Sequence, residues 1–98
     1  MALRTTETDN TVTIHIHGRF DFAAHQEFLR AYKAYDKGER CFSVDLANAD
    51  YMDSSAMGML LQLREYACKD APVKLINGSG SIMEILRIAN FDKLFAIE

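Results

Sequence analysis

A chain of 98 residues, of which 49% are hydrophobic, has enough apolar material for one compact core. We therefore expect a single domain over residues 1–98. The net charge is -3 and the basic residues are scattered, which argues against nucleic acid as a partner. Because no apolar run approaches the roughly 20 residues that cross a bilayer and no secretory signal pattern is visible, the sequence predicts a cytoplasmic protein without membrane insertion.

The chain begins with two runs of strand-like residues, 3–8 and 12–17. The second run alternates strictly between apolar and polar side chains, as a half-buried strand does. Asp9-Asn10 separates the runs and tolerates turn conformations, which predicts an antiparallel hairpin. Gly18 is expected to end the second strand.

A helix and a third strand are expected next. Asp21 is well placed to cap an amphipathic helix over about residues 22–36, which Gly38 would end. Residues 41–46 alternate again as a strand, and residues 48–53 are expected to form a turn.

The rest of the chain carries two more helices with a short strand between them, expected over residues 56–67, 73–76 and 82–89. Ser81 and Glu84 have the spacing of a capping box at the start of the last helix. Asn90 can adopt the left-handed conformation that closes a helix. Residues 91–97 would then pack onto the core or form a short last strand.

This order of elements predicts an α/β fold with a mixed sheet of four to five strands and three main helices. The N-terminal hairpin is antiparallel, and the later strands must be parallel because helices connect them. Residues 18–21, 48–55 and 77–79 all follow the carboxyl ends of strands, where open α/β sheets place their sites. We expect these segments to be neighbours in space.

Several residue types that often carry chemistry favour ordinary interpretations here. Cys41 and Cys68 lie in regular apolar patterns without metal-ligand spacing, which favours reduced, partly buried thiols rather than a disulfide or a zinc site. His15 and His17 share a strand face, but no third metal ligand is evident. The loop 77–80 lacks the Lys-Ser/Thr of a phosphate-binding loop and is interpreted as a turn. No metal or other cofactor is expected.

Asp53-Ser54-Ser55 precedes the second helical segment and allows three interpretations. The first interpretation is a helix cap alone, since any of the three side chains can accept a hydrogen bond from a backbone N–H there. A hydrolase nucleophile is disfavoured, because no Gly-x-Ser-x-Gly turn and no suitably placed histidine accompany the serines. A serine at a helix start can also be a phosphorylation site, since helix amides and the helix dipole stabilise the added dianion.

The residues around these serines suit a surface that binds another protein. Asp50 and Asp53 would repel a phosphate, so modification would change the local charge strongly. Met52, Met57 and Met59 have flexible side chains suited to docking, although core packing is an equally ordinary role for methionine. The first helical turn is apolar nearly all round, which predicts that Met57 or Met59 stays outside the core.

Over essentially its whole length the chain resembles the STAS domain family of anti-sigma factor antagonists. The segments that carry this resemblance are Gly-Arg-Phe-Asp at 18–21, Val-Asp-Leu at 44–46, Tyr-Met-Asp-Ser-Ser at 51–55 and the final helix and tail at 82–95. The resemblance implies a protein that is not an enzyme and is phosphorylated on Ser55. It also implies two partners: a histidine-kinase-like serine kinase that acts as an anti-sigma factor, and a metal-dependent serine phosphatase, in some cases fused to a receiver domain.

In this interpretation the unphosphorylated protein binds its kinase partner and phosphorylation releases it. Asp53 and Ser54 would shape the helix entry, and Asp21 and Asp45 are candidates for the same face. The chain departs from the family pattern at Ala56, where glycine usually follows the phosphoserine. We expect a methyl group there to affect access to Ser55.

Two other functions stay open at the level of the sequence. A non-switching STAS subunit that supports the assembly of a transporter ATPase is the main alternative. A nucleotide-binding module or an enzyme is the weakest. The sequence is compatible with a monomer or a weak dimer.

Overall fold

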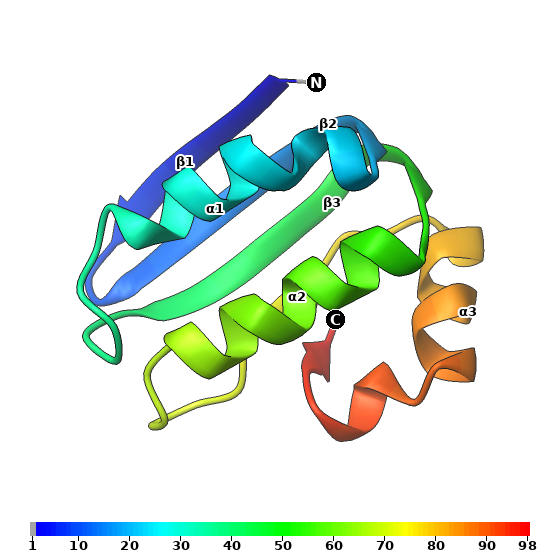
Figure 1. The fold of residues 1–98 in the computed structure, drawn as a ribbon. Helices are drawn as coiled ribbons and strands as arrows, with labels where there is room; N and C mark the ends of the chain where they lie inside the picture. Colours follow the sequence, from blue (N-terminus) through cyan, green and yellow to red (C-terminus); the bar gives the residue numbers. More distant parts are fainter. Residues whose placement is uncertain (1) are drawn as a thin grey trace.

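A computed structural model describes residues 2–98 (Figure 1). The strands are β1 (Ala2–Thr8), β2 (Thr11–Phe20), β3 (Cys41–Met52), β4 (Lys74–Ile76) and β5 (Ala96–Ile97). The helices are α1 (His25–Lys33), α2 (Ser54–Tyr66) and α3 (Gly80–Ile88), with short 3-10 helices η1 (Phe22–Ala24) and η2 (Phe91–Lys93). No helix within the described range is long and apolar enough to cross a membrane.

The five strands form one mixed sheet in the order β1-β2-β3-β4-β5. β1 and β2 pair antiparallel, and the other three pairs are parallel. α1 and α2 lie side by side over one face of this sheet, and both begin at the end where β2 and β3 finish (Figure 1). The predicted fold class is therefore confirmed.

The hairpin forms where the alternation predicted it, but β2 runs further than expected. Asp9 adopts a left-handed conformation in the turn, with φ of 53°. Gly18 does not end β2: it has φ of 85°, lies at an irregularity in the pairing with β3, and the strand continues to Phe20. A side chain at Gly18 would be strained because L-residues rarely adopt this φ.

The largest difference from prediction is the length of β3. Residues 48–53 were expected to form a turn, but β3 continues to Met52 because its second half pairs with the end of β2. Pairing with β2 thus overrides the polar local sequence of this segment of β3, since strand propensity depends strongly on context.

The helix predicted over residues 22–36 is shorter than expected, and it consists of η1 followed by α1.

The caps of the last helix show one wrong and one correct expectation. Ser79, not Ser81, caps α3, with its Oγ accepting from Ile82 N at 3.4 Å. Asn90 has φ of 63° and closes the helix in the left-handed conformation, as predicted. The polypeptide then returns through η2 to β5, which adds the expected short last strand beside β4.

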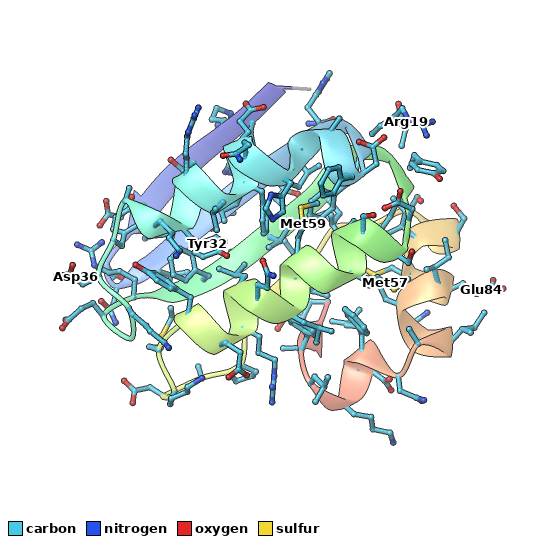
Figure 2. All side chains as sticks on the ribbon, viewed as in Figure 1. Arg19, Tyr32, Asp36, Met57, Met59 and Glu84 are labelled. Carbon is cyan, nitrogen blue, oxygen red and sulfur yellow. A yellow bond between two sulfur atoms is a disulfide. The ribbon has the colours of Figure 1, made fainter. Side chains whose placement is uncertain are left out.

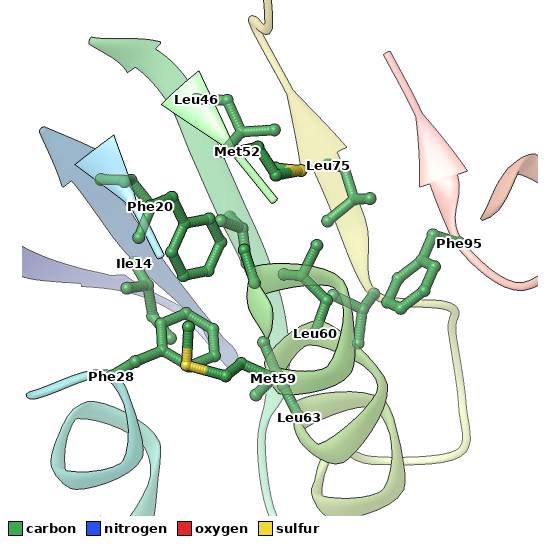
Figure 3. Close-up of a cluster of buried hydrophobic side chains, with 14 of the residues drawn as sticks. Ile14, Phe20, Phe28, Leu46, Met52, Met59, Leu60, Leu63, Leu75 and Phe95 are labelled. Carbon is green, nitrogen blue, oxygen red and sulfur yellow. The ribbon is translucent and has the colours of Figure 1, made fainter. Parts of the chain in front are cut away.

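The core lies between the sheet and the helices. Alternate β2 residues, including Ile14 and Phe20, point toward Phe28 of α1 and Leu60 of α2, and all four are at most 1% exposed (Figure 3). The other face of β2 carries polar side chains. The strict alternation visible in the sequence therefore separates a packed face from a polar face.

The expectation of reduced cysteines was wrong. Cys41 and Cys68 form a disulfide, with Cα atoms 5.0 Å apart. Cys41 begins β3 and Cys68 follows the end of α2, and they are separated by 27 positions in the sequence. Only the packing of α2 back along the sheet brings the two residues together, so spacing alone gave no sign of the pair.

Candidate functional site

The junction between β3 and α2 carries the serines singled out in the sequence. Asp53 has an extended backbone, and its Oδ1 accepts a hydrogen bond from Ala56 N at 3.1 Å. The Asp53 carbonyl accepts from Met57 N at 3.2 Å, which begins the helical pattern. Asp53 is therefore the N-cap of α2, and Ser54 and Ser55 occupy the first two helical positions.

The two serines differ in exposure. Ser54 is exposed, whereas Ser55 is half-buried. Both belong to the first turn of a helix of 13 residues. An α-helix leaves its first amides without intrahelical partners and carries partial positive charge at this end. The junction can therefore accommodate an anionic group on a serine hydroxyl without unfolding the helix.

Asp21 lies at the same end of the neighbouring strand. Phe20 is the register partner of Met52, so Asp21 and Asp53 each follow directly after paired residues. Asp21 Oδ1 accepts from Ala23 N at 3.1 Å and caps η1, while Asp21 Oδ2 lies 3.3 Å from Arg19 Nε. The structure thus brings the two capping aspartates to one edge of the sheet, as the order of elements predicted.

An exposed cluster beside this edge was not anticipated from the sequence. The Arg19 guanidinium stacks over the Tyr51 ring at 3.8 Å (Arg19 is labelled in Figure 2). Phe22 is 70% exposed and stacks on His25, with ring centroids 5.6 Å apart. The only sequence signal for Phe22 was an aromatic residue placed directly after the predicted cap Asp21. The Arg19–Tyr51 contact follows only from the register of β2 and β3.

Three of the residues expected at an interface lie in the core instead. Met52, Ala56 and Met59 are at most 5% exposed. Met59 of α2 lies beside Phe28 of α1 (Figure 3). The Ala56 methyl group likewise packs into the core, so it does not stand on the surface beside Ser55.

The remaining expected residues are accessible. Met57 is half-buried, and in Figure 2 it lies on the opposite side of α2 from Met59. This agrees with the expectation that one of these two methionines stays outside the core. Asp50 is exposed at the end of β3. The accessible part of the junction thus presents acidic, hydroxyl and methionine side chains.

Asp45 lies on the polar face of the sheet in a network of its own. His15 Nδ1 lies 2.7 Å from Asp45 Oδ2, and His15 Nε2 lies 2.9 Å from Thr6 Oγ1. Asp45 Oδ1 accepts from Asn77 Nδ2 at 3.1 Å and from Ala47 N at 3.0 Å. This network connects β1, β2 and β3 to the loop after β4.

Both ring nitrogens of His15 are therefore engaged by protein atoms. Burial raises the pKa of Asp45, but hydrogen bonds from Ala47, Asn77 and His15 and the nearby imidazole outweigh it, so the pKa lies below its ordinary value. The alternation of β2 and β3 already placed His15 and Asp45 at polar positions. Their pairing across strands needed the register, in which they are direct partners.

Comparison with known proteins agrees with this architecture. The family model described as STAS domain matches residues 2–98. A STAS-domain containing protein of Pseudomonas aeruginosa (strain UCBPP-PA14) is 51% identical over 87 residues, which cover 88% of this chain and 86% of that protein.

Two solved structures of anti-sigma factor antagonists have a similar fold. The antagonist SpoIIAA in its unphosphorylated form aligns with a TM-score of 0.69 and 20% identity, covering 99% of this chain and 87% of that one. An antagonist from Mycobacterium paratuberculosis aligns with a TM-score of 0.80 and 14% identity, covering 98% and 83%. With a family match along the described chain and a relative of high identity, the chain belongs to the STAS domain family.

Proposed function

We propose that this protein is a partner-switching regulator of the anti-sigma factor antagonist type, controlled by phosphorylation of Ser55. In the unphosphorylated state it binds a histidine-kinase-like anti-sigma factor or a similar regulator. Phosphorylation of Ser55 releases that partner, and a metal-dependent serine phosphatase restores binding. The protein itself carries out no catalytic step in this cycle.

The observation that carries the proposal is the position of Ser55 in the first turn of α2, two residues after the Asp53 cap. A phosphate on Ser55 would carry about -1.5 to -2 charge at neutral pH, beside helix amides that stabilise anions. The fold would therefore persist while the surface changes. A binding surface can be switched in this way without a rearrangement of the core.

The accessible side chains beside the serine explain why such a charge would act on binding. Asp50 is exposed and Met57 is half-buried at this junction. A partner that buries Met57 would have to bury a dianion close to an existing carboxylate after phosphorylation. Burying a charge without a partner costs several kcal/mol, which is enough to dissociate a typical regulatory complex.

The modification itself is tested by incubating the protein with ATP and its cognate kinase and mapping the phosphate by mass spectrometry. We expect phosphate on Ser55 in the wild type and in Ser54→Ala, and none in Ser55→Ala. Ser54→Ala is the matched control, because the exposed Ser54 occupies the preceding position of the same helical turn.

Partner binding is the second readout. Ser55→Asp should weaken binding to the kinase at least tenfold, whereas Ser55→Ala should retain it. Phosphate found elsewhere than on Ser55, or equal binding by both variants, would refute the proposal. Constant association with a transporter ATPase, insensitive to both substitutions, would instead favour a structural subunit.

A further inference from the structure

A disulfide joins the start of β3 to the segment after α2, far from the junction between β3 and α2 that carries the serines. Cys41 is the first residue of β3, and Cys68 lies two residues beyond Tyr66, the last residue of α2. The S–S bond therefore closes a covalent ring over residues 41–68, and this ring contains Ser55. Reduction would open the ring at the end away from the serine.

Non-covalent contacts hold the two cysteines close independently of the S–S bond. Cys68 N donates to Arg40 O at 2.8 Å, and Gly38 N donates to Tyr66 O at 2.9 Å. The Tyr66 hydroxyl also donates to Tyr35 O. Because these bonds tie the segment before β3 to the end of α2, the thiols would remain adjacent after reduction and could pair again in the folded protein.

The pair is partly accessible, and two cationic side chains lie beside it. Cys41 is half-buried, whereas Cys68 is 5% exposed. Cys68 lines a surface hollow of about 170 Å³ together with Arg64 and Lys69. Arg64 Nη1 lies 3.6 Å from Glu65 Oε2, so its charge is partly neutralised, whereas Lys69 forms no ion pair among residues 2–98. A small thiol that carries carboxylates is attracted to this hollow mainly by Lys69.

We propose that Cys41 and Cys68 form a reversible thiol–disulfide site that reacts with small anionic thiols and disulfides of the glutathione class and sets the stability of the β3–α2 unit. The sequence predicts a cytoplasmic protein, and in such a reducing compartment permanent disulfides are uncommon, whereas reversible ones occur as redox sites. The site does not depend on phosphorylation of Ser55.

The exchange balances without any further reactant. A protein thiolate attacks one sulfur of a small disulfide RSSR, which releases one RS⁻ and leaves a mixed disulfide on the protein. The second protein thiolate attacks the protein sulfur of that mixed disulfide and releases the second RS⁻. The two protons lost by the cysteines end on the released thiols, so the protein dithiol and RSSR give the protein disulfide and two RSH.

Closing the ring should stabilise the fold, because it restricts the unfolded chain over 27 positions. For a domain of this size we expect the melting temperature of the oxidised protein to exceed that of the reduced protein by on the order of 10 °C. Hydrogen exchange in α2 should slow on oxidation, since local opening of its C-terminal end would be restrained.

The test uses the folded wild-type protein in buffers with graded ratios of reduced to oxidised glutathione. After acid quenching and alkylation, mass spectrometry counts free thiols, and the melting temperature is measured at each ratio. We expect one reversible transition between the dithiol and the disulfide, accompanied by the thermal shift. Cys41→Ser and Cys68→Ser should each accumulate a single glutathione adduct, and the double variant should melt at the same temperature at every ratio.

Three results would overturn the proposal. A disulfide that persists in the folded wild type at the highest proportion of reduced glutathione would be a permanent crosslink. Thiols that stay free under oxidising ratios would show that the pair does not form. A transition without a thermal shift would remove the stabilising role. All three are read from the wild type, so they hold even if a variant fails to fold.

Discussion

Asp53 Oδ1 accepts a hydrogen bond from Ala56 N at 3.1 Å, so the residues on either side of the two serines hold each other in place. The bond satisfies one of the amides that a helix start leaves without a partner. Ala56 contributes a second constraint, because its side chain is fully buried in the core. The backbone that presents Ser54 and Ser55 is thus restrained by a cap and by packing.

Removing this cap should destabilise the protein. We expect Asp53→Ala to lower the free energy of unfolding by about 1 kcal/mol, as loss of an N-cap typically does. Asp53→Asn should retain most of the stability, because its amide oxygen can accept the same bond. Urea denaturation measures both, and equal stability of the two variants would argue against a capping role.

A substitution at Gly58 should stabilise the protein instead. It lies inside α2, and a Cβ at this position would meet nothing within 4 Å. Gly58→Ala should therefore raise the free energy of unfolding by about 0.5–1 kcal/mol, the usual preference for alanine in a helix interior. Gly18→Ala is the matched control: it should lower stability by about 1–2 kcal/mol, because Gly18 has φ of 85°. Thermal and urea unfolding distinguish the two directions, and destabilisation by Gly58→Ala would contradict the open space around it.

The network around Asp45 predicts a contribution to stability that depends on pH. Its pKa in the folded protein lies below the ordinary value of 3.8, so the carboxylate stabilises the fold above that value and loses this effect as the pH falls through the folded pKa. Asp45→Asn should therefore lose less stability than the wild type on acidification below about pH 4. Urea midpoints measured from pH 7 down to pH 2.5 check this. Parallel curves for the two proteins would show that the network does not favour the charged form.

Two consecutive leucines of α2 test the assignment of its buried face. Leu60 is 0% exposed, whereas Leu61 is 38% exposed. Leu60→Ala should cost about 2–5 kcal/mol, because it removes core contacts and leaves a cavity. Leu61→Ala should change stability by less than about 0.5–1 kcal/mol. Similar losses of stability in both variants would show that the buried face of α2 is assigned wrongly.

The hairpin and the helices were predictable because their signals are local. The alternation over residues 12–17 predicted a half-buried strand, in which Ile14 is indeed buried, and the capping chemistry of Asp21 and Asn90 marked the ends of helical segments. The end of β3 was not predictable in this way. Residues 48–53 were expected to form a turn, yet β3 continues to Met52 because β2 supplies pairing partners.

For the candidate site, the sequence indicated the aspartates and serines but not which neighbouring side chains face outward. Met57 and Met59 are two positions apart and chemically identical, and only the packing of α2 against α1 and the sheet buries Met59 and leaves Met57 partly exposed. The stacking of Arg19 on Tyr51 likewise depends on the strand register.

By itself, then, the sequence determined the α/β order of elements, the mixed sheet and the motif Asp53-Ser54-Ser55 at a helix start, because periodicity and capping act over a few residues. The tertiary structure alone decided the Cys41–Cys68 disulfide, the His15–Asp45 pair and the burial of Met59. Each of these joins residues that are distant along the chain or distinguishes equivalent positions on one helix. Such relationships arise only when the sheet register and the packing of the helices bring specific faces together.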